Sequence, residues 1–295
     1  MNSFETYLKQ QLHSKTSIIY YLYQIRDYLK WCKTRKENPN QIDYKTFLKY
    51  VKRLQGKQWK AETVNNKIRA VKYYYDYLID QNEIIENPAE EVKVKRAVTK
   101  VLSNLLSSDE LEDLYYSYKT QKINDFYFTA VAKRNKVITG LIVYQALNSN
   151  SLHKLKLEHL DLYKGKIYIP RTAKSNYRTL ELKPWQVIEL LEYINEYRPK
   201  LQKHINLYNE AIFPTNCSHF TPIIHTLIKH LRYTNQKVKN VSQLRASVIT
   251  IWLTKNNIRE VQQMAGHRYI GSTEKYIQDN LENLQEAINI FHPMC

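Results

Sequence analysis

The chain has 295 residues, of which 43% are hydrophobic, so it can build the cores of two ordinary domains and is not a disordered tail. Lysine and arginine number 45 against 28 acidic residues, and the net charge of +17 favours a polyanionic partner, with RNA as well as DNA left open. Three scattered cysteines argue against a disulfide framework or a zinc site, and we find no signal peptide and no apolar stretch of membrane-spanning length. We therefore expect a cytoplasmic protein that needs no metal and contacts no membrane.

The first third of the chain has helical periodicity. Apolar residues recur three or four positions apart over residues 3–13, 15–35, 44–55 and 64–80. Asn38-Pro39-Asn40 interrupts the pattern, Asp43 is placed as an N-cap, and Thr63 starts the last of these helices. Asn87-Pro88 ends the segment. Four helices in so short a stretch predict a compact all-α domain over residues 1–88.

A basic segment follows this domain. Residues 89–106 have weak helical periodicity and include Lys93, Lys95 and Arg96. An extended basic linker can follow a phosphate backbone, although it can equally be a solvated connection without contacts. We predict a linker here and a second domain over residues 107–295.

The second domain mixes helices with a short pair of strands. Ser107-Ser108-Asp109-Glu110 is a helix-start signal, and helices are predicted over 109–120, 133–147, 184–197, 221–235, 242–256 and 258–265. Residues 166–169 and 178–182 alternate with period two around a polar turn at 173–177. This pattern predicts an α+β domain with a small antiparallel sheet, and a mainly α protein as a whole.

Three residues near the end of the chain have the chemistry for cutting a DNA strand without a metal. These are Arg245, His267 and Tyr276. The phenol of a tyrosine can attack a backbone phosphate, while a cation and an imidazole stabilise the charge that builds on the phosphate oxygens. Tyrosine is common here, at 25 of 295 residues, so Tyr276 alone indicates little. The specific signal is the joint pattern of the three residues with Leu244 and Gly266.

With these residues, the chain resembles the tyrosine recombinase (phage integrase) family, of the two-domain Xer or integrase-like type. Arginine, Gly-His and tyrosine follow the family spacing, with 22 residues from Arg245 to His267 and 9 from His267 to Tyr276. The first domain is similar to the SAM-like core-binding domain, and the second to the catalytic domain. The resemblance implies that double-stranded DNA is contacted by residues of the segment 62–72, namely Thr63, Asn66, Lys67, Arg69 and Lys72.

The resemblance also implies a mechanism. Tyr276 attacks the scissile phosphate to form a 3′-phosphotyrosyl bond, so neither ATP nor a cofactor is required. Arg245 binds non-bridging oxygens, and His267 hydrogen-bonds the phosphate or manages the tyrosine's proton. Lys174, in the turn between the strands, matches a lysine that protonates the leaving 5′-oxygen. It is also compatible with an ordinary solvated lysine.

Two positions depart from the family pattern. Asn148 stands where the first catalytic arginine belongs, and Ser242 replaces the first histidine of His-x-x-Arg. Losing one charge-assisted contact removes roughly 1.5–3 kcal/mol, or one to two powers of ten in rate. A relocated cation, Arg171 or Arg178, is one way to compensate. Slow chemistry, or help from another subunit, is a second.

Other functions remain open at this level. A catalytically impaired DNA-binding relative would account for Asn148, although it has no chemical need for Tyr276. A type IB topoisomerase would share the chemistry without joining two specific sites. We expect a site-specific recombinase that integrates or excises a mobile element, with accessory directionality proteins as further partners.

The last predicted helix bears on assembly. Residues 281–291 place Leu281, Leu284, Ile288 and Phe291 on one helical face. This face can pack on the chain's own catalytic domain. The family resemblance instead implies exchange with a neighbouring subunit, in a tetramer on two DNA sites.

Overall fold

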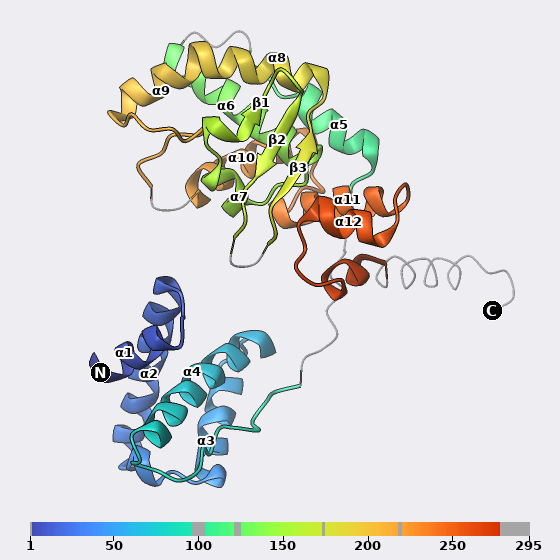
Figure 1. Ribbon diagram of the computed structural model, residues 1–295. Coiled ribbons are helices and arrows are strands. Elements are labelled where there is room, and N and C mark those ends of the chain that lie inside the picture. The colour runs from blue at the N-terminus through green and yellow to red at the C-terminus, as the bar shows by residue number, and fades with distance from the viewer. Residues whose placement is uncertain (1, 96–103, 121–124, 173–174, 218–219, 278–295) are drawn as a thin grey trace, which may run out of the picture. The chain divides into compact units, whose positions relative to one another are not determined.

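The computed structural model describes residues 2–95, 104–120, 125–172, 175–217 and 220–277 (Figure 1). The chain divides into two compact units, residues 1–99 and 100–295, each with its own hydrophobic core. The predicted fold class, mainly helical with one small antiparallel sheet, is confirmed.

Four helices form the first unit, as the periodicity predicts. They are α1 (Asn2–Gln10), α2 (Lys15–Arg35), α3 (Tyr44–Gln55) and α4 (Ala61–Asp80), with a 3-10 turn at Pro39–Gln41. Ser14 and Asp43 cap the N-termini of α2 and α3, because each side chain accepts a hydrogen bond from a backbone N–H of the first turn. The helices enclose an aromatic core, in which the buried side chains include Tyr28, Phe47, Tyr50 and Tyr75.

Residues 89–95 pack on this first unit. Ala89 is fully buried in its core, and the Asn65 side chain makes two hydrogen bonds of 2.8 Å with the backbone of Val94. Lys72 of α4 donates to the carbonyl oxygen of Glu90 at 3.1 Å. The first unit therefore continues past the end that the sequence predicts, because contacts between residues distant in sequence hold this segment in place.

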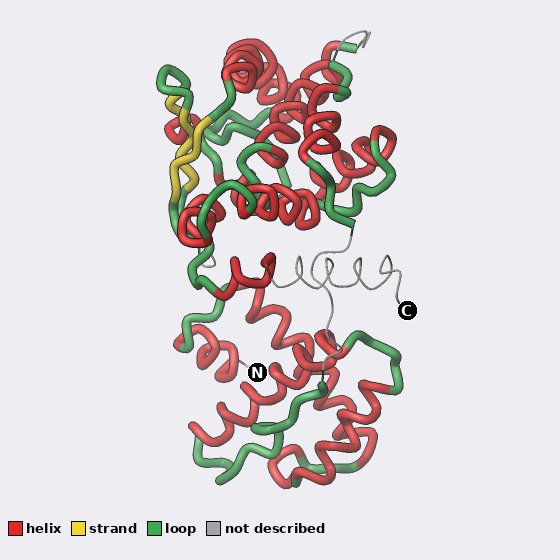
Figure 2. The backbone as a smooth tube through the Cα atoms, turned by 90° about the vertical axis from the view of Figure 1, so that its right-hand side faces the viewer, coloured by secondary structure: helices red, strands yellow, loops and turns green. Residues whose placement is uncertain are grey.

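The second unit contains the remaining elements. They are α5 (Ser108–Tyr116), α6 (Phe126–Val143), α7 (Ser149–Lys154), a 3-10 turn (Leu157–His159), β1 (Leu160–Asp161), β2 (Lys166–Ile169), β3 (Arg178–Glu181), α8 (Pro184–Glu192), a π-turn η3 (Tyr193–Tyr197), α9 (Arg198–Ile205), α10 (Thr221–Thr234), α11 (Val241–Leu253) and α12 (Ile258–Ala265). Residues 271–277 are also helical. In Figure 2 the strands lie at one edge of this unit, with the helices to one side of them.

The sheet is a three-stranded antiparallel meander in the order β1–β2–β3. In the β2–β3 pair, Ile169 lies opposite Arg178 and Ile167 opposite Leu180. Burial alternates along both strands, so these four side chains face inward. Three of them are apolar, and the fourth is the arginine.

The elements differ from the sequence prediction mainly at their ends. Helix α6 begins at Phe126, before the predicted start, because the Asp125 side chain caps it. It ends before the predicted residue 147, and Ala146 takes a left-handed conformation with φ of 51°. The helix predicted over 184–197 continues through η3 into α9. Helix α7 and strand β1 are too short to show a period in the sequence.

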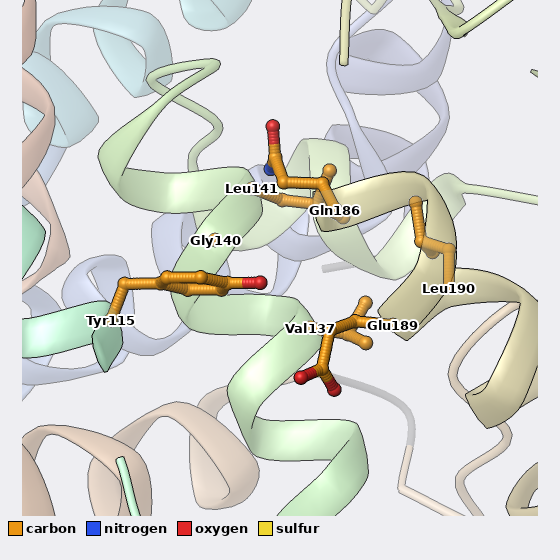
Figure 3. Close-up of a pocket in the computed structure, with 7 residues that line it drawn as sticks. All are labelled: Tyr115, Val137, Gly140, Leu141, Gln186, Glu189 and Leu190. Carbon is orange, nitrogen blue, oxygen red and sulfur yellow. The ribbon is translucent and has the colours of Figure 1, made fainter. Parts of the chain in front are cut away.

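A small cavity of about 10 Å³ lies between α5, α6 and α8 of the second unit (Figure 3). Its lining includes Tyr115, Gly140 and Gln186. This volume holds about one water molecule, so the cavity is a packing defect and not a ligand site. Of the helices in the described ranges, none is long and apolar enough to cross a membrane.

Candidate active site

Arg245 is oriented by the backbone around it. It lies on α11, and its guanidinium donates to the carbonyl oxygen of Ala146, to that of Ala265 at 2.6 Å, and to Nε2 of His267 at 3.3 Å. Burial lowers the pKa of Arg245, and the phenolate form of Tyr276 opposes that shift. The cation predicted from the sequence is therefore held in a fixed direction by groups from two separate segments, at residue 146 and at residues 265–267.

His267 follows the glycine that ends α12. Gly266 takes a left-handed conformation, with φ of 69°, and turns the chain so that the imidazole faces Arg245. Nδ1 of His267 lies 2.9 Å from Oγ1 of Thr273, which is fully buried. Arginine can only donate, so Nε2 accepts, and the proton of the neutral ring lies on Nδ1 and is donated to Thr273.

The pKa of His267 is lowered to about 4. Burial is the largest cause, followed by the positive charges of Arg245 and Arg178. The imidazole is therefore neutral at neutral pH, in the tautomer that its contacts require.

Tyr276 lies against this histidine in the same chain. Its ring is stacked on that of His267, with the centroids 5.8 Å apart and the planes at 12°. Burial raises the pKa of the phenol, and Arg245 opposes the shift. The structure thus brings Arg245, His267 and Tyr276 together at one place.

Arg178 is a fourth member of this cluster, and it belongs to β3. It is 3% exposed, and the structure gives Nε and both terminal nitrogens no hydrogen-bond partner within the part of the chain that it describes. Burial and the charge of Arg245 lower the pKa of Arg178 to about 9, so it remains protonated at neutral pH. A side chain on Gly266 would place a Cβ 3.0 Å from Cζ of Arg178, so the glycine also makes room for the guanidinium.

The connection between β2 and β3 is attached to the same loop as His267. The backbone N–H of Asn176 donates to the carbonyl oxygen of Gly266 at 3.0 Å, and Ser175 forms an isolated β-bridge with His267. Thr172 and Ser175 hydrogen-bond each other through backbone and side chains. Lys174 itself lies outside the described residues.

Three other predicted site residues have different surroundings. Asn148 caps α7 by accepting from the backbone N–H of Ser151 at 2.9 Å, so its side chain has a structural contact. Ser242 is exposed, one turn before Arg245 on α11. Arg171 is exposed and lines an open pocket of about 480 Å³ whose lining includes none of the clustered residues. The suggestion that Arg171 supplies the missing charge is therefore not supported, because the residue faces another surface.

The predicted DNA-contacting residues of the first unit fall into two groups. Thr63 and Arg69 of α4 are exposed, Asn66 is partly exposed and accepts a hydrogen bond from Arg69, and Lys93 and Lys95 are exposed. Arg96 lies outside the described residues.

Lys67 and Lys72 make hydrogen bonds within the first unit. Lys72 contacts Glu90, as described above. Lys67 is 8% exposed, donates to Oε1 of Gln24 and lies 4.5 Å from the ring centroid of Trp59. Burial lowers its pKa. The prediction of a surface contact is wrong for Lys67, because its ammonium group is enclosed by side chains of its own unit.

Sequence reasoning missed the residues that orient the cluster. Thr273 and the carbonyl groups of Ala146 and Ala265 belong to no motif used in the prediction. The carbonyl contacts leave no signal in the side-chain pattern. Thr273 lies six residues after His267, in the first turn of the helix at residues 271–277. This short separation in the chain is the signal from which it could have been found.

Comparisons with known proteins identify the family. The chain matches the profile of the phage integrase N-terminal SAM-like domain over residues 1–82 and that of the phage integrase family over residues 104–283. It is 22% identical over 259 residues to the tyrosine recombinase XerC of Oceanobacillus iheyensis. That match covers 85% of this chain and 81% of the XerC protein. It is 23% identical over 296 residues to the TnP I resolvase of Bacillus thuringiensis, covering 97% and 98%.

A solved structure shares the fold. The XerH site-specific recombinase, bound to its difH substrate in a pre-cleavage complex, superimposes with a TM-score of 0.66 at 17% identity. The match covers 90% of this chain and 76% of the XerH chain. With both profiles matched in order, and the arginine, histidine and tyrosine of the motif gathered at one place, the chain belongs to the phage integrase family.

Proposed function

We propose that this chain is a site-specific tyrosine recombinase that cuts and rejoins DNA strands through a 3′-phosphotyrosyl intermediate. The observation that carries the proposal is the stacking of Tyr276 on His267 beside Arg245, within one chain. A nucleophile, a neutral base and an oriented cation are the groups that a phosphoryl transfer without a metal requires. In the described residues, no three metal-binding side chains gather.

In the proposed cleavage step, the phenol oxygen of Tyr276 attacks phosphorus and the bond from phosphorus to the 5′-oxygen breaks. The phenol proton is accepted by Nε2 of His267, the neutral imidazole stacked against the ring, once Arg245 turns its N–H from that nitrogen to the phosphate. Arg245 binds the non-bridging oxygens, where negative charge accumulates. The leaving 5′-oxygen takes up a proton, for which Lys174 is the proposed donor. The reverse reaction, with a 5′-hydroxyl from another strand, completes recombination.

DNA binding by the first unit is the second part of the proposal. The net charge of +17 favours a nucleic acid, and Thr63, Asn66 and Arg69 lie along accessible positions of α4. Lys93 and Lys95 extend this set along the basic segment. Lys67 is left out because its ammonium is already bound inside the unit. We propose duplex DNA as the substrate, in the integration or excision of a mobile element.

We further propose that the protein acts as a tetramer on two DNA sites, with accessory directionality proteins. The predicted exchange of helix 281–291 concerns residues outside those described. Deleting residues 281–295 should weaken the pairing of two sites more than binding to one site. Equal losses in gel-shift assays of both would contradict exchange.

The decisive experiment is covalent trapping. Duplexes that bind the chain are selected from a random-sequence pool, nicked at successive positions, and incubated with the wild type or with Tyr276→Phe. We expect a denaturant-resistant protein–DNA adduct with the wild type alone. An adduct that survives Tyr276→Phe would exclude Tyr276 as the nucleophile.

A second function, a DNA-binding relative impaired in catalysis, is favoured by one observation. Asn148 caps α7 and contributes no charge to the cluster. Under this alternative, tight and sequence-specific binding is expected without any adduct at any nick position.

A further inference from the structure

We infer that Arg178 is a catalytic residue of this site, which binds a non-bridging oxygen of the scissile phosphate beside Arg245. The inference rests on the proposed function, since it needs a phosphodiester bound beside Arg178 and Arg245. It assigns the missing positive charge to a strand residue that faces inward, at a position the sequence motif does not include.

The first argument is the absence of a partner. Arg178 is 3% exposed, and its five N–H groups have no hydrogen-bond acceptor among the residues that the structure describes. A buried guanidinium without a partner is strongly unfavourable, because it has lost its hydration and gained nothing in return. Such a group is retained where a ligand completes its contacts. Its five donors in a planar fork match the oxygens of a phosphate.

The second argument is the charge of the cluster. The charge of Arg245 contributes to lowering the pKa of Arg178, and both arginines lower the pKa of His267. Within the described residues, the two cations lie beside the neutral imidazole of His267, on which the phenol of Tyr276 is stacked. An anion is the group that would stabilise both cations at once. The phosphodiester brings one negative charge, and further charge develops on its oxygens as the Tyr276 bond forms and the bond to the 5′-oxygen breaks.

The third argument is the way in which Arg178 is positioned. β3 begins at Arg178, and the residues just before it are bonded to the loop of Gly266 and His267. The absence of a Cβ at Gly266 leaves room for the guanidinium directly beside this loop. The contacts therefore fix the positions of the arginine, the histidine and the glycine relative to one another. Such fixed positions are the preorganisation that stabilising a transition state requires.

Two variants of Arg178 test the assignment. Arg178→Met removes the charge and keeps an unbranched side chain as far as the position of Nε, and Arg178→Lys keeps a charge without the planar fork. Each is measured for the single-turnover rate of adduct formation on a nicked duplex that the wild type cleaves. A second duplex carries a methylphosphonate at the cut, in which a methyl group replaces one charged oxygen.

On the ordinary duplex we expect Arg178→Met to slow cleavage by about 100-fold or more, and Arg178→Lys to retain part of the rate. On the methylphosphonate the deficit of Arg178→Met should shrink at least about tenfold, because the substrate no longer has the charge that the arginine would bind. The melting temperature of free Arg178→Met should rise by a few degrees, since an unpaired buried charge has been removed. Wild-type cleavage by Arg178→Met, or an equal deficit on both duplexes with a lowered melting temperature, would overturn the inference.

A binding measurement separates this inference from the proposed function. If the wild type forms no adduct at all, the recombinase proposal fails, and inorganic phosphate at constant ionic strength then serves as the probe. Thermal stabilisation of the wild type by phosphate that is lost in Arg178→Met would support an oxyanion site at Arg178. Equal stabilisation of both proteins would contradict it.

Discussion

Two buried arginines in the second unit have opposite surroundings. Arg198, at the start of α9, is 7% exposed, and its guanidinium donates to the carbonyl oxygens of Ala211 and Asn209 and to the side chain of Gln202. Arg178, in β3, is 3% exposed, and the structure gives it no acceptor among the described residues. The two regions therefore differ in whether the buried guanidinium has hydrogen-bond acceptors within the chain.

The contrast shows how a buried cation can be interpreted. Around Arg198 the chain supplies two backbone carbonyl oxygens and one side-chain amide oxygen as acceptors. The arginine thereby joins α9 to the loop at residues 209–211. Around Arg178 the neighbours are another arginine, a neutral imidazole and the backbone of Gly266. A paired buried arginine supports the fold, whereas an unpaired one is suited to receiving an anion.

Truncation of Arg198 should have the largest effect on stability. Arg198→Met removes three hydrogen bonds and leaves the carbonyl oxygen of Ala211 unpaired, whereas Gln202 still donates to that of Asn209. We therefore expect a loss of about 3 kcal/mol in the free energy of unfolding. Urea denaturation measures it. Arg178→Met, in the same experiment, should change stability in the opposite direction. A loss of stability in both variants would remove the distinction between the two regions.

The pH dependence of stability should sharpen the comparison. The pKa of His267 is about 4 in the folded protein, below the roughly 6.5 of an unfolded histidine, so the folded state binds fewer protons. Its contribution is therefore fully present above about pH 6.5 and is lost as the pH falls from 6.5 through 4. The shift corresponds to about 3 kcal/mol, which partial exposure to solvent reduces to about 2 kcal/mol.

The arginine variants provide the control for this titration. Arg178 is one of the charges that hold the pKa of His267 down, whereas Arg198 is not among the causes of that shift. Arg178→Met should raise the pKa of His267, followed by NMR of the ring protons, and reduce the stability lost in acid. Arg198→Met should leave that pKa in place. An unchanged pKa in Arg178→Met would show that the two side chains do not interact.

A smaller effect is expected at Thr273. Thr273→Val keeps the shape but removes the acceptor at 2.9 Å from Nδ1 of His267, so the imidazole loses its preferred tautomer and orientation. We expect about a tenfold drop in cleavage rate, with DNA binding retained. Thr273→Ser, which keeps the hydroxyl group, should restore the rate and the pH profile. Failure of the serine variant to do so would assign Thr273 to packing alone.

Much of the fold could be predicted from local patterns. The helices α2, α3 and α12 and the strand β2 have the predicted bounds, because an amphipathic helix or strand shows its period directly in the sequence. The N-caps at Asp43 and Ser107 could also be predicted from the sequence. Arg245, His267 and Tyr276 could be selected together because their spacing in the chain is specific, although their distances in space were not available.

The rest required the tertiary structure, for a physical reason. Alternation along β3 places Arg178 on the same face as Leu180, but only the packing of the sheet decides that this face is covered and that Arg178 lies near Arg245 and His267. Burial of Lys67 likewise depends on Gln24 and Trp59, which are distant from it in sequence. The sequence by itself determined the mainly helical class, the basic charge and the order of the catalytic motif. The tertiary structure decided which cations are paired, because pairing is a property of neighbours in space.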